Sequence, residues 1–170
     1  DCPLHGEVSI SGSKNAVLPI LAATVLCSEP CVVAGVPGLK DVDIMCRLIG
    51  SLGAKVERNM EDHSVYIDPS CIDICEAPDE LVKMMRASMV VMGPLLSRMG
   101  KAVIPLPGGC AIGDRPVELH LKGFKALGAH IDIDKDGVVS GECERLKGDN
   151  IYLDFPSVGA TENIVMAATL

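Results

Sequence analysis

The feature of this chain that most constrains its fold is an internal repeat with a period of 75 residues. The triplet Leu-Gly-Ala occurs at 52–54 and again at 127–129, and each copy ends a segment with helical spacing of apolar residues. These segments predict helices over 41–52 and 115–127, each closed by a glycine in the left-handed conformation. A repeat of this kind predicts that one small unit of helices and strands is built more than once.

The predicted unit is helix, strand, helix, strand, strand. Its first copy comprises a helix over 13–27, a strand over 31–34, the helix over 41–52, and strands over 55–58 and 65–67. Its second copy comprises a helix over 81–99, a strand over 101–104, the helix over 115–127, and strands over 131–133 and 138–139. The Asp-Gly pair at 136–137 favours a tight turn between the last two strands. A third copy is expected to begin with a strand over 151–153 and a helix from 157 to 170, so we interpret the chain as a piece of a longer protein.

This order of elements predicts an α/β (α+β) fold in which helices group against short sheets related by pseudo-symmetry. The segments 19–26 and 89–96 are apolar nearly all round, which is typical of helices at the centre of a domain. Aromatic residues make up only 2% of the chain, so the core is expected to be aliphatic.

Composition excludes several function classes. The net charge of −8 argues against a general nucleic-acid or anionic-membrane surface. No apolar run approaches the roughly 18 residues that span a bilayer, and no signal peptide is recognisable. Eight cysteines without a CxxC pair or paired histidines argue against zinc, and no metal or other cofactor is expected. Most of the cysteines are expected to be small buried residues in a protein of the reducing cytoplasm.

Basic residues stand at the expected starts of two repeat-related helices. Lys14 and Asn15 open the helix over 13–27, and Arg86 lies in the first turns of the helix over 81–99. A cation is unfavourable at a helix N-terminus until an anion binds there, where free N–H groups and the cation converge on it. Residues 157–159 are expected to add a third set of backbone donors. The alternative is that each basic residue is a solvated surface charge.

The loop over 105–120 carries the most reactive side chains of the sequence. Cys110 follows two glycines and lies five residues before Arg115, a setting that lowers the pKa of a thiol. Pro116 is well placed in a first helical turn, so Arg115 is expected at another helix start, where a guanidinium can hold phosphate or carboxylate through two hydrogen bonds. The alternative is an ordinary loop cysteine. His120 is expected to be structural or to contact the edge of a ligand.

Several stretches together resemble the UDP-N-acetylglucosamine 1-carboxyvinyltransferase family of enolpyruvyl transferases. The resemblance rests on the segments 11–16, 85–88, 106–113, 115–120 and 157–161, and it runs along the whole chain. It implies an inverse α/β barrel of the kind found in two pseudo-symmetric domains of a much longer chain. Residues 13–170 would then be most of one domain, with two repeats and the start of a third. Residues 1–12, with a short strand at 8–10, would cross from the other domain, which is absent from these 170 residues.

The resemblance implies that an enolpyruvyl group passes from phosphoenolpyruvate to the 3-hydroxyl of UDP-N-acetylglucosamine by addition and elimination, with release of phosphate, as the first committed step of peptidoglycan synthesis. Cys110 would be the general acid and the site of covalent modification by phosphoenolpyruvate or the inhibitor fosfomycin. Contacts to phosphoenolpyruvate would come from Lys14, Asn15 and Arg115. Contacts to UDP-N-acetylglucosamine would come from Asn15, Arg86, Arg115, Pro116, Val117, Glu118, Leu119, Ser157, Val158 and Gly159.

The sequence departs from this pattern in two respects. Phe155-Pro156 stands where some members carry Lys-Val, so one cation at the diphosphate is missing. The base for the sugar hydroxyl and further arginines would lie in the absent domain, so the 170 residues alone are expected to be inactive. Two alternatives stay open. One is the sister synthase that acts on shikimate 3-phosphate, which has no use for a loop cysteine, and the other is a repeat-built binding module in which Cys110 is incidental.

Overall fold

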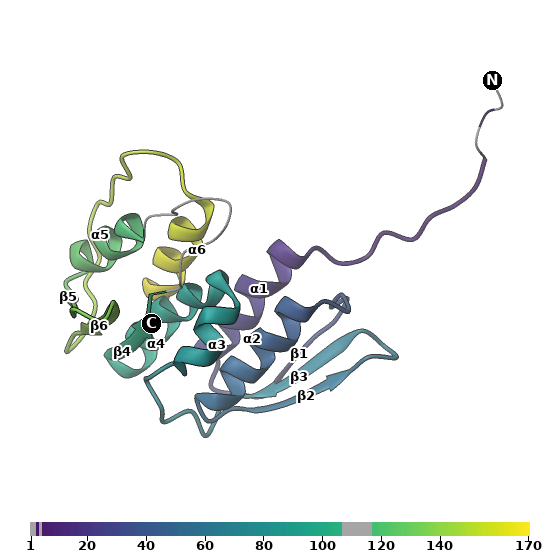
Figure 1. The fold of residues 1–170 in the computed structure, drawn as a ribbon, viewed down its shortest axis with the longest axis horizontal. Coiled ribbons are helices and arrows are strands. Elements are labelled where there is room, and N and C mark those ends of the chain that lie inside the picture. The colour runs from purple at the N-terminus through teal and green to yellow at the C-terminus, as the bar shows by residue number, and fades with distance from the viewer. Residues whose placement is uncertain (1–2, 4, 107–116) are drawn as a thin grey trace.

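The computed structural model of the protein describes residues 3, 5–106 and 117–170, and for Arg86 the backbone alone (Figure 1). Helices and short strands alternate along this part of the chain, in agreement with the predicted α/β class. The elements are, in order, α1 (Lys14–Ala23), the 3-10 helix η1 (Thr24–Leu26), β1 (Cys31–Val33), α2 (Lys40–Ser51), β2 (Lys55–Asn59), β3 (Ser64–Asp68), α3 (Asp79–Met84), the 3-10 helix η2 (Arg86–Val91), α4 (Met92–Met99), β4 (Lys101–Pro105), α5 (Glu118–Ala126), β5 (His130–Ile133), β6 (Val138–Glu142) and α6 (Val158–Ala167).

The two complete repeats have the same sheet topology. Each forms a three-stranded antiparallel sheet in which the last strand lies in the middle, in the order β1-β3-β2 in the first repeat and β4-β6-β5 in the second. In the first sheet Ile67 pairs with both Cys31 and Val56, and in the second Val139 pairs with both Ile104 and Ile133. The repeat inferred from the sequence is therefore confirmed at the level of strand order.

The predicted helix ends and turns are also confirmed. Gly53 and Gly128 follow α2 and α5 with φ angles of 110° and 91°, a conformation that side chains with a Cβ rarely adopt. The β5–β6 turn is closed by Asp134, whose Oδ1 accepts hydrogen bonds from the N–H groups of Asp136 and Val138 at 2.8 and 2.9 Å. The β5–β6 hairpin thus has the local chemistry that the sequence indicated.

The single helix predicted over 81–99 is wrong. α3 ends at Met84, Met85 is extended with ψ 112°, a 3-10 helix follows, and α4 begins only at Met92. Pro94 explains part of the difference, because proline has no N–H to donate and its ring crowds the carbonyl one turn earlier. The break at Met85 gives the second repeat a new helix start at Arg86, which corresponds to the start of α1.

One predicted strand is wrong as well. Residues 151–153 form no strand, although Ile151 and Leu153 pack against the core while Tyr152 is exposed. The alternation of side chains is kept there without a partner strand in the described part of the chain, and a strand requires such a partner. Residues 8–10 pair with no strand among the described residues, and Val8 and Ile10 are 85% and 91% exposed. The crossover strand expected there stays a prediction, because its partners would lie in the other domain. The helix predicted from residue 115 is described only from Glu118.

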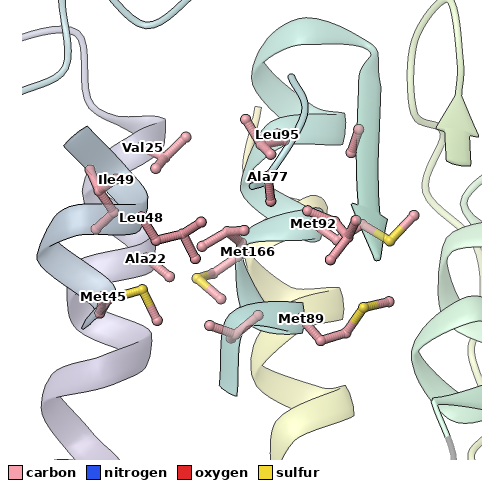
Figure 2. Close-up of a cluster of buried hydrophobic side chains, with 14 of the residues drawn as sticks. Ala22, Val25, Met45, Leu48, Ile49, Ala77, Met89, Met92, Leu95 and Met166 are labelled. Atoms are coloured by element: carbon pink, nitrogen blue, oxygen red, sulfur yellow. The ribbon is translucent and has the colours of Figure 1, made fainter. Parts of the chain in front are cut away.

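The core is aliphatic and lies between the helices. Side chains from α1, α2, the segment 87–99 and α6 meet in one cluster, part of which is drawn in Figure 2, where Met166 lies between Ala22 and Leu48 on one side and Met92 on the other. Figure 1 shows these helices between the two sheets, an arrangement with helices inside and sheets outside. Within the described residues, no helix is both long enough and apolar enough to cross a lipid bilayer.

α6 lies unusually close to its neighbours because of two glycines. A Cβ on Gly93 of α4 would come within 2.2 Å of the Asn163 carbonyl oxygen, and a Cβ on Gly123 of α5 would come within 2.2 Å of the Ile164 side chain. α6, the helix that begins the third repeat, therefore packs closely against α4 and α5 of the second repeat. This close packing fixes the position of the α6 N-terminus.

Candidate functional site

Three helices begin at equivalent positions of the repeat, with their last non-helical residues at Ser13, Met85 and Ser157, each 72 residues from the next. All three of these residues are extended, with ψ angles of 128°, 112° and 110°. The helices that follow, α1, η2 and α6, pack against one another. Figure 1 shows that α1 and α6 both begin on the upper side of the molecule and run downward.

Lys14 connects the start of α1 to the start of α2. Its Nζ lies 2.8 Å from Oδ2 of Asp41, and the two side chains are 45% and 35% exposed. The pair is accessible to solvent, so an incoming anion can replace the carboxylate as the partner of the ammonium group. Asn15 is exposed beside Lys14, as a ligand contact requires.

The start of α6 is capped by its own side chain. Ser157 Oγ accepts a hydrogen bond of 3.3 Å from the Ala160 N–H, and Val158 is 77% exposed. An open groove of about 450 Å³ lies beside this start, lined by Leu153, Pro156, Ser157, Val158, Thr161, Glu162 and Val165. Partial burial raises the pKa of the Glu162 carboxyl. The groove is mainly apolar, with the helix start at Ser157 at one end and the Glu162 carboxyl in its lining.

The start of α5 lies against the start of α6. Val117 precedes α5, Glu118 is exposed and Leu119 is buried. The ring of His120 faces Gly159, because a Cβ on that glycine would lie 3.7 and 3.8 Å from His120 Cε1 and Nε2. Two segments that were predicted to contact the nucleotide sugar, 117–119 and 157–159, are thus neighbours in the structure.

Several predicted site residues lie outside the described residues. They are Cys110, Arg115 and Pro116, and the side chain of Arg86 is likewise not described. The roles expected for these four residues therefore stay predictions.

Sequence reasoning missed Asn163, a fully buried amide at the junction of α4, α5 and α6. Its Nδ2 lies 3.0 Å from His120 Nδ1, and desolvation by burial lowers the pKa of that imidazole. The sequence gives no distinctive signal for this role, because Asn163 directly follows two other polar residues of α6, Thr161 and Glu162.

The cysteines differ from the prediction. Of the six described free cysteines, only Cys46 is buried, whereas Cys71 is exposed and the others are half-buried, namely Cys27, Cys31, Cys75 and Cys143. Cys27, Cys31 and Cys143 lie at the ends of η1, β1 and β6, and Cys71 and Cys75 lie in the segment between β3 and α3, so each is close to solvent on one side. Across the described ranges, no group of three His, Cys, Asp or Glu side chains is placed to hold a metal ion.

Comparison with known proteins gives close relatives. The chain is 54% identical over 166 residues to UDP-N-acetylglucosamine 1-carboxyvinyltransferase 1 of Caldanaerobacter subterraneus subsp. tengcongensis, with 98% of this chain and 39% of the relative covered. It is 52% identical over 165 residues to the enzyme of the same name from Clostridium acetobutylicum, with 97% and 39% covered. The chain therefore spans about two fifths of the length of the curated relatives that it matches.

Solved structures agree on the fold. The enolpyruvyl transferase NikO from Streptomyces tendae superposes with a TM-score of 0.81 at 23% identity, covering 96% of this chain and 38% of that one. EPSP synthase from Acinetobacter baumannii superposes with a TM-score of 0.72 at 19% identity, covering 95% and 37%. The family model for EPSP synthase (3-phosphoshikimate 1-carboxyvinyltransferase) matches residues 2–170. The chain belongs to this family of enolpyruvyl-transferring enzymes.

Proposed function

We propose that the full-length protein that carries this chain transfers the enolpyruvyl group of phosphoenolpyruvate to the 3-hydroxyl of UDP-N-acetylglucosamine, in the cytoplasm and in the service of peptidoglycan synthesis. Curated relatives at 50–54% identity have this activity in their names, whereas the EPSP synthase structure is 19% identical. This difference favours the amino-sugar acceptor over shikimate 3-phosphate.

The observation that carries the proposal is the packing of three equivalent helix starts, two of which begin with a basic residue. Lys14 and Arg86 stand at the first two starts, and Ser157–Gly159 form the third. In this described part of the chain, no acidic residue lies in the first turn of any of these three helices. Helix N-termini and cations attract phosphate and carboxylate, the groups that both substrates carry.

In the proposed reaction, the 3-hydroxyl oxygen of the sugar attacks C2 of phosphoenolpyruvate while its proton passes to a base of the second domain. The Cys110 thiol gives its proton to C3, which forms a tetrahedral adduct with a new C–O bond. In the elimination, a proton returns from C3 to the Cys110 thiolate, the C–O bond between C2 and the phosphate breaks, and the double bond is restored. The leaving inorganic phosphate takes the proton that the base had accepted. Lys14, Asn15 and Arg115 hold the phosphate and carboxylate of phosphoenolpyruvate.

In this proposal the nucleotide sugar binds between the starts of α5 and α6. Residues 115–119 line the uridine, residues 157–159 give backbone donors to the diphosphate, and Arg86 adds a cation. Because the base lies in the second domain, residues 1–170 alone should show no enolpyruvyl transfer.

Alkylation by fosfomycin tests the proposal directly. We expect mass spectrometry of the full-length protein to find the adduct on Cys110, formed faster when UDP-N-acetylglucosamine is present. Cys71 provides the matched control, because it is an exposed thiol on another part of the chain and should stay unmodified. Equal labelling of the two thiols, or phosphate release with shikimate 3-phosphate as the acceptor, would refute the proposal.

A further inference from the structure

Asn163 joins three segments that are distant in sequence. Its side chain is fully buried, its Oδ1 accepts a 2.8 Å hydrogen bond from the Gly93 N–H, and its Nδ2 donates a 2.8 Å bond to the Met89 carbonyl. The same Nδ2 lies 3.0 Å from His120 Nδ1. A buried amide with this many partners fixes the relative positions of η2, α4, α5 and α6.

The two backbone partners determine which end of the amide is oxygen. A backbone N–H can only donate and a carbonyl can only accept, so the atom that faces Gly93 is the oxygen and the atom that faces Met89 is the nitrogen. The second hydrogen of Nδ2 is then directed to His120 Nδ1. That ring nitrogen must accept, and the single proton of a neutral imidazole is left on Nε2.

The position of the His120 ring brings the protonated Nε2 close to the proposed diphosphate site. The Cε1–Nε2 edge of His120 faces Gly159 in the first turn of α6, where the proposed diphosphate donors lie. An Nε2–H adds a donor on this side, whereas an unprotonated Nε2 would present a lone pair.

We propose that Asn163 is a positioning residue that holds His120 as the Nε2–H tautomer beside the start of α6 and thereby sets the affinity of the site for a nucleoside diphosphate sugar. This inference rests on the proposed function, but the protonation of the ring can be measured without any activity. Burial, which lowers the pKa of His120, acts in the same direction by keeping the ring neutral.

The first test is nitrogen-15 NMR of the full-length protein, with the His120 signals assigned by their loss in His120→Gln. The expected pattern at neutral pH is a protonated Nε2 and an unprotonated Nδ1. Asn163→Asp keeps an acceptor for the Gly93 N–H but replaces the donor at His120 with a carboxylate, so Nδ1 should become protonated. An unchanged pattern in Asn163→Asp would overturn the proposal.

The second test is the dissociation constant for UDP-N-acetylglucosamine, measured by calorimetry. Asn163→Asp should weaken binding roughly fivefold to tenfold, the effect of one lost or reversed hydrogen bond. Should that variant not fold, Asn163→Ser serves, with the expectation of mixed tautomers and weaker binding. Val65→Ala is the control, because it removes buried volume in the distant first sheet and should leave both readouts unchanged.

The two tests distinguish a failure of the proposed function from a failure of the role proposed for Asn163. If the wild-type protein does not bind UDP-N-acetylglucosamine, the proposed function fails, whatever the NMR pattern. If it binds and Asn163→Asp changes neither the tautomer nor the affinity, or if Val65→Ala weakens binding equally, the role of Asn163 fails.

Discussion

The close approach of α6 to α4 makes Gly93→Ala an informative substitution. A Cβ at this position would lie 2.2 Å from the carbonyl oxygen of Asn163 and 2.5 Å from its Oδ1. Real Cβ atoms do not approach backbone this closely, so the two helices must move apart. The movement also stretches the hydrogen bond between the Gly93 N–H and Asn163 Oδ1, now 2.8 Å long.

Three contributions determine the size of the effect. Overpacking a close helix contact costs about 1–3 kcal/mol, and weakening the buried hydrogen bond costs about another 1 kcal/mol. The greater helix propensity of alanine stabilises the folded state by about 1 kcal/mol and offsets part of this loss. We therefore expect Gly93→Ala to lower the free energy of unfolding by about 1–3 kcal/mol, mostly through the overpacking.

Urea denaturation measures this change, and Gly50→Ala is the matched control. Gly50 also lies within a helix, but a Cβ there would meet no atom within 4 Å. The same substitution should therefore be neutral or raise the free energy of unfolding by up to about 1 kcal/mol. If the two variants were equally stable, the close packing of α6 on α4 would be refuted.

Three further predictions concern other contacts. Asp41→Asn should change the free energy of unfolding by less than about 1 kcal/mol in urea denaturation, because its ion pair with Lys14 is solvent-exposed; a larger loss would mean that the pair is structural. Arg98→Lys should cost about 1–3 kcal/mol, because a lysine cannot replace the guanidinium bonds to three carbonyls that join η1 to the end of β3. The stability advantage of the wild type over His120→Gln should shrink as the pH falls below 6.5, the ordinary pKa of histidine, because burial lowers the folded-state pKa and the unfolded chain then binds more protons. A pH-independent difference in denaturation midpoints would contradict the burial of that imidazole.

The repeat, the strand order and the turns could be predicted because their signals are local. Gly53 and Gly128 mark helix ends in both copies, and the Asp-Gly pair at 136–137 marks a hairpin, without reference to the rest of the chain. The break at Met85 could not be predicted, because residues 81–92 include no glycine or proline and suit one continuous helix. Residues 151–153 alternate as a strand does, but a strand also needs an available edge to pair with, which local sequence does not reveal.

The residues of the candidate site likewise fall into those that local sequence predicts and those that it does not. The helix starts at Lys14 and Ser157 could be predicted from residue types that are unusual at those positions. Asn163 and Arg98 were missed, because their partners lie about 70 residues away in the sequence. Their importance depends on which helices pack together, and this is decided by buried surface across the whole domain.

The distribution of acidic residues over helix N-termini gives a physical reason to place an anion site at the centre of the fold. Acidic side chains stand in the first turn of three helices, namely Asp41 and Asp43 in α2, Asp79 and Glu80 in α3, and Glu118 in α5. Among the helices that the structure describes, the repeat-related α1, η2 and α6 carry none, as do η1 and α4, and α1 and η2 also begin with a cation. Acidic residues at a helix start stabilise it by about 0.3–1 kcal/mol each, so α1, η2 and α6 lack a stabilisation that α2, α3 and α5 have. The lack of acidic residues at these repeat-related starts is expected if bound phosphate and carboxylate groups satisfy them, together with the Ser157 side chain at the start of α6.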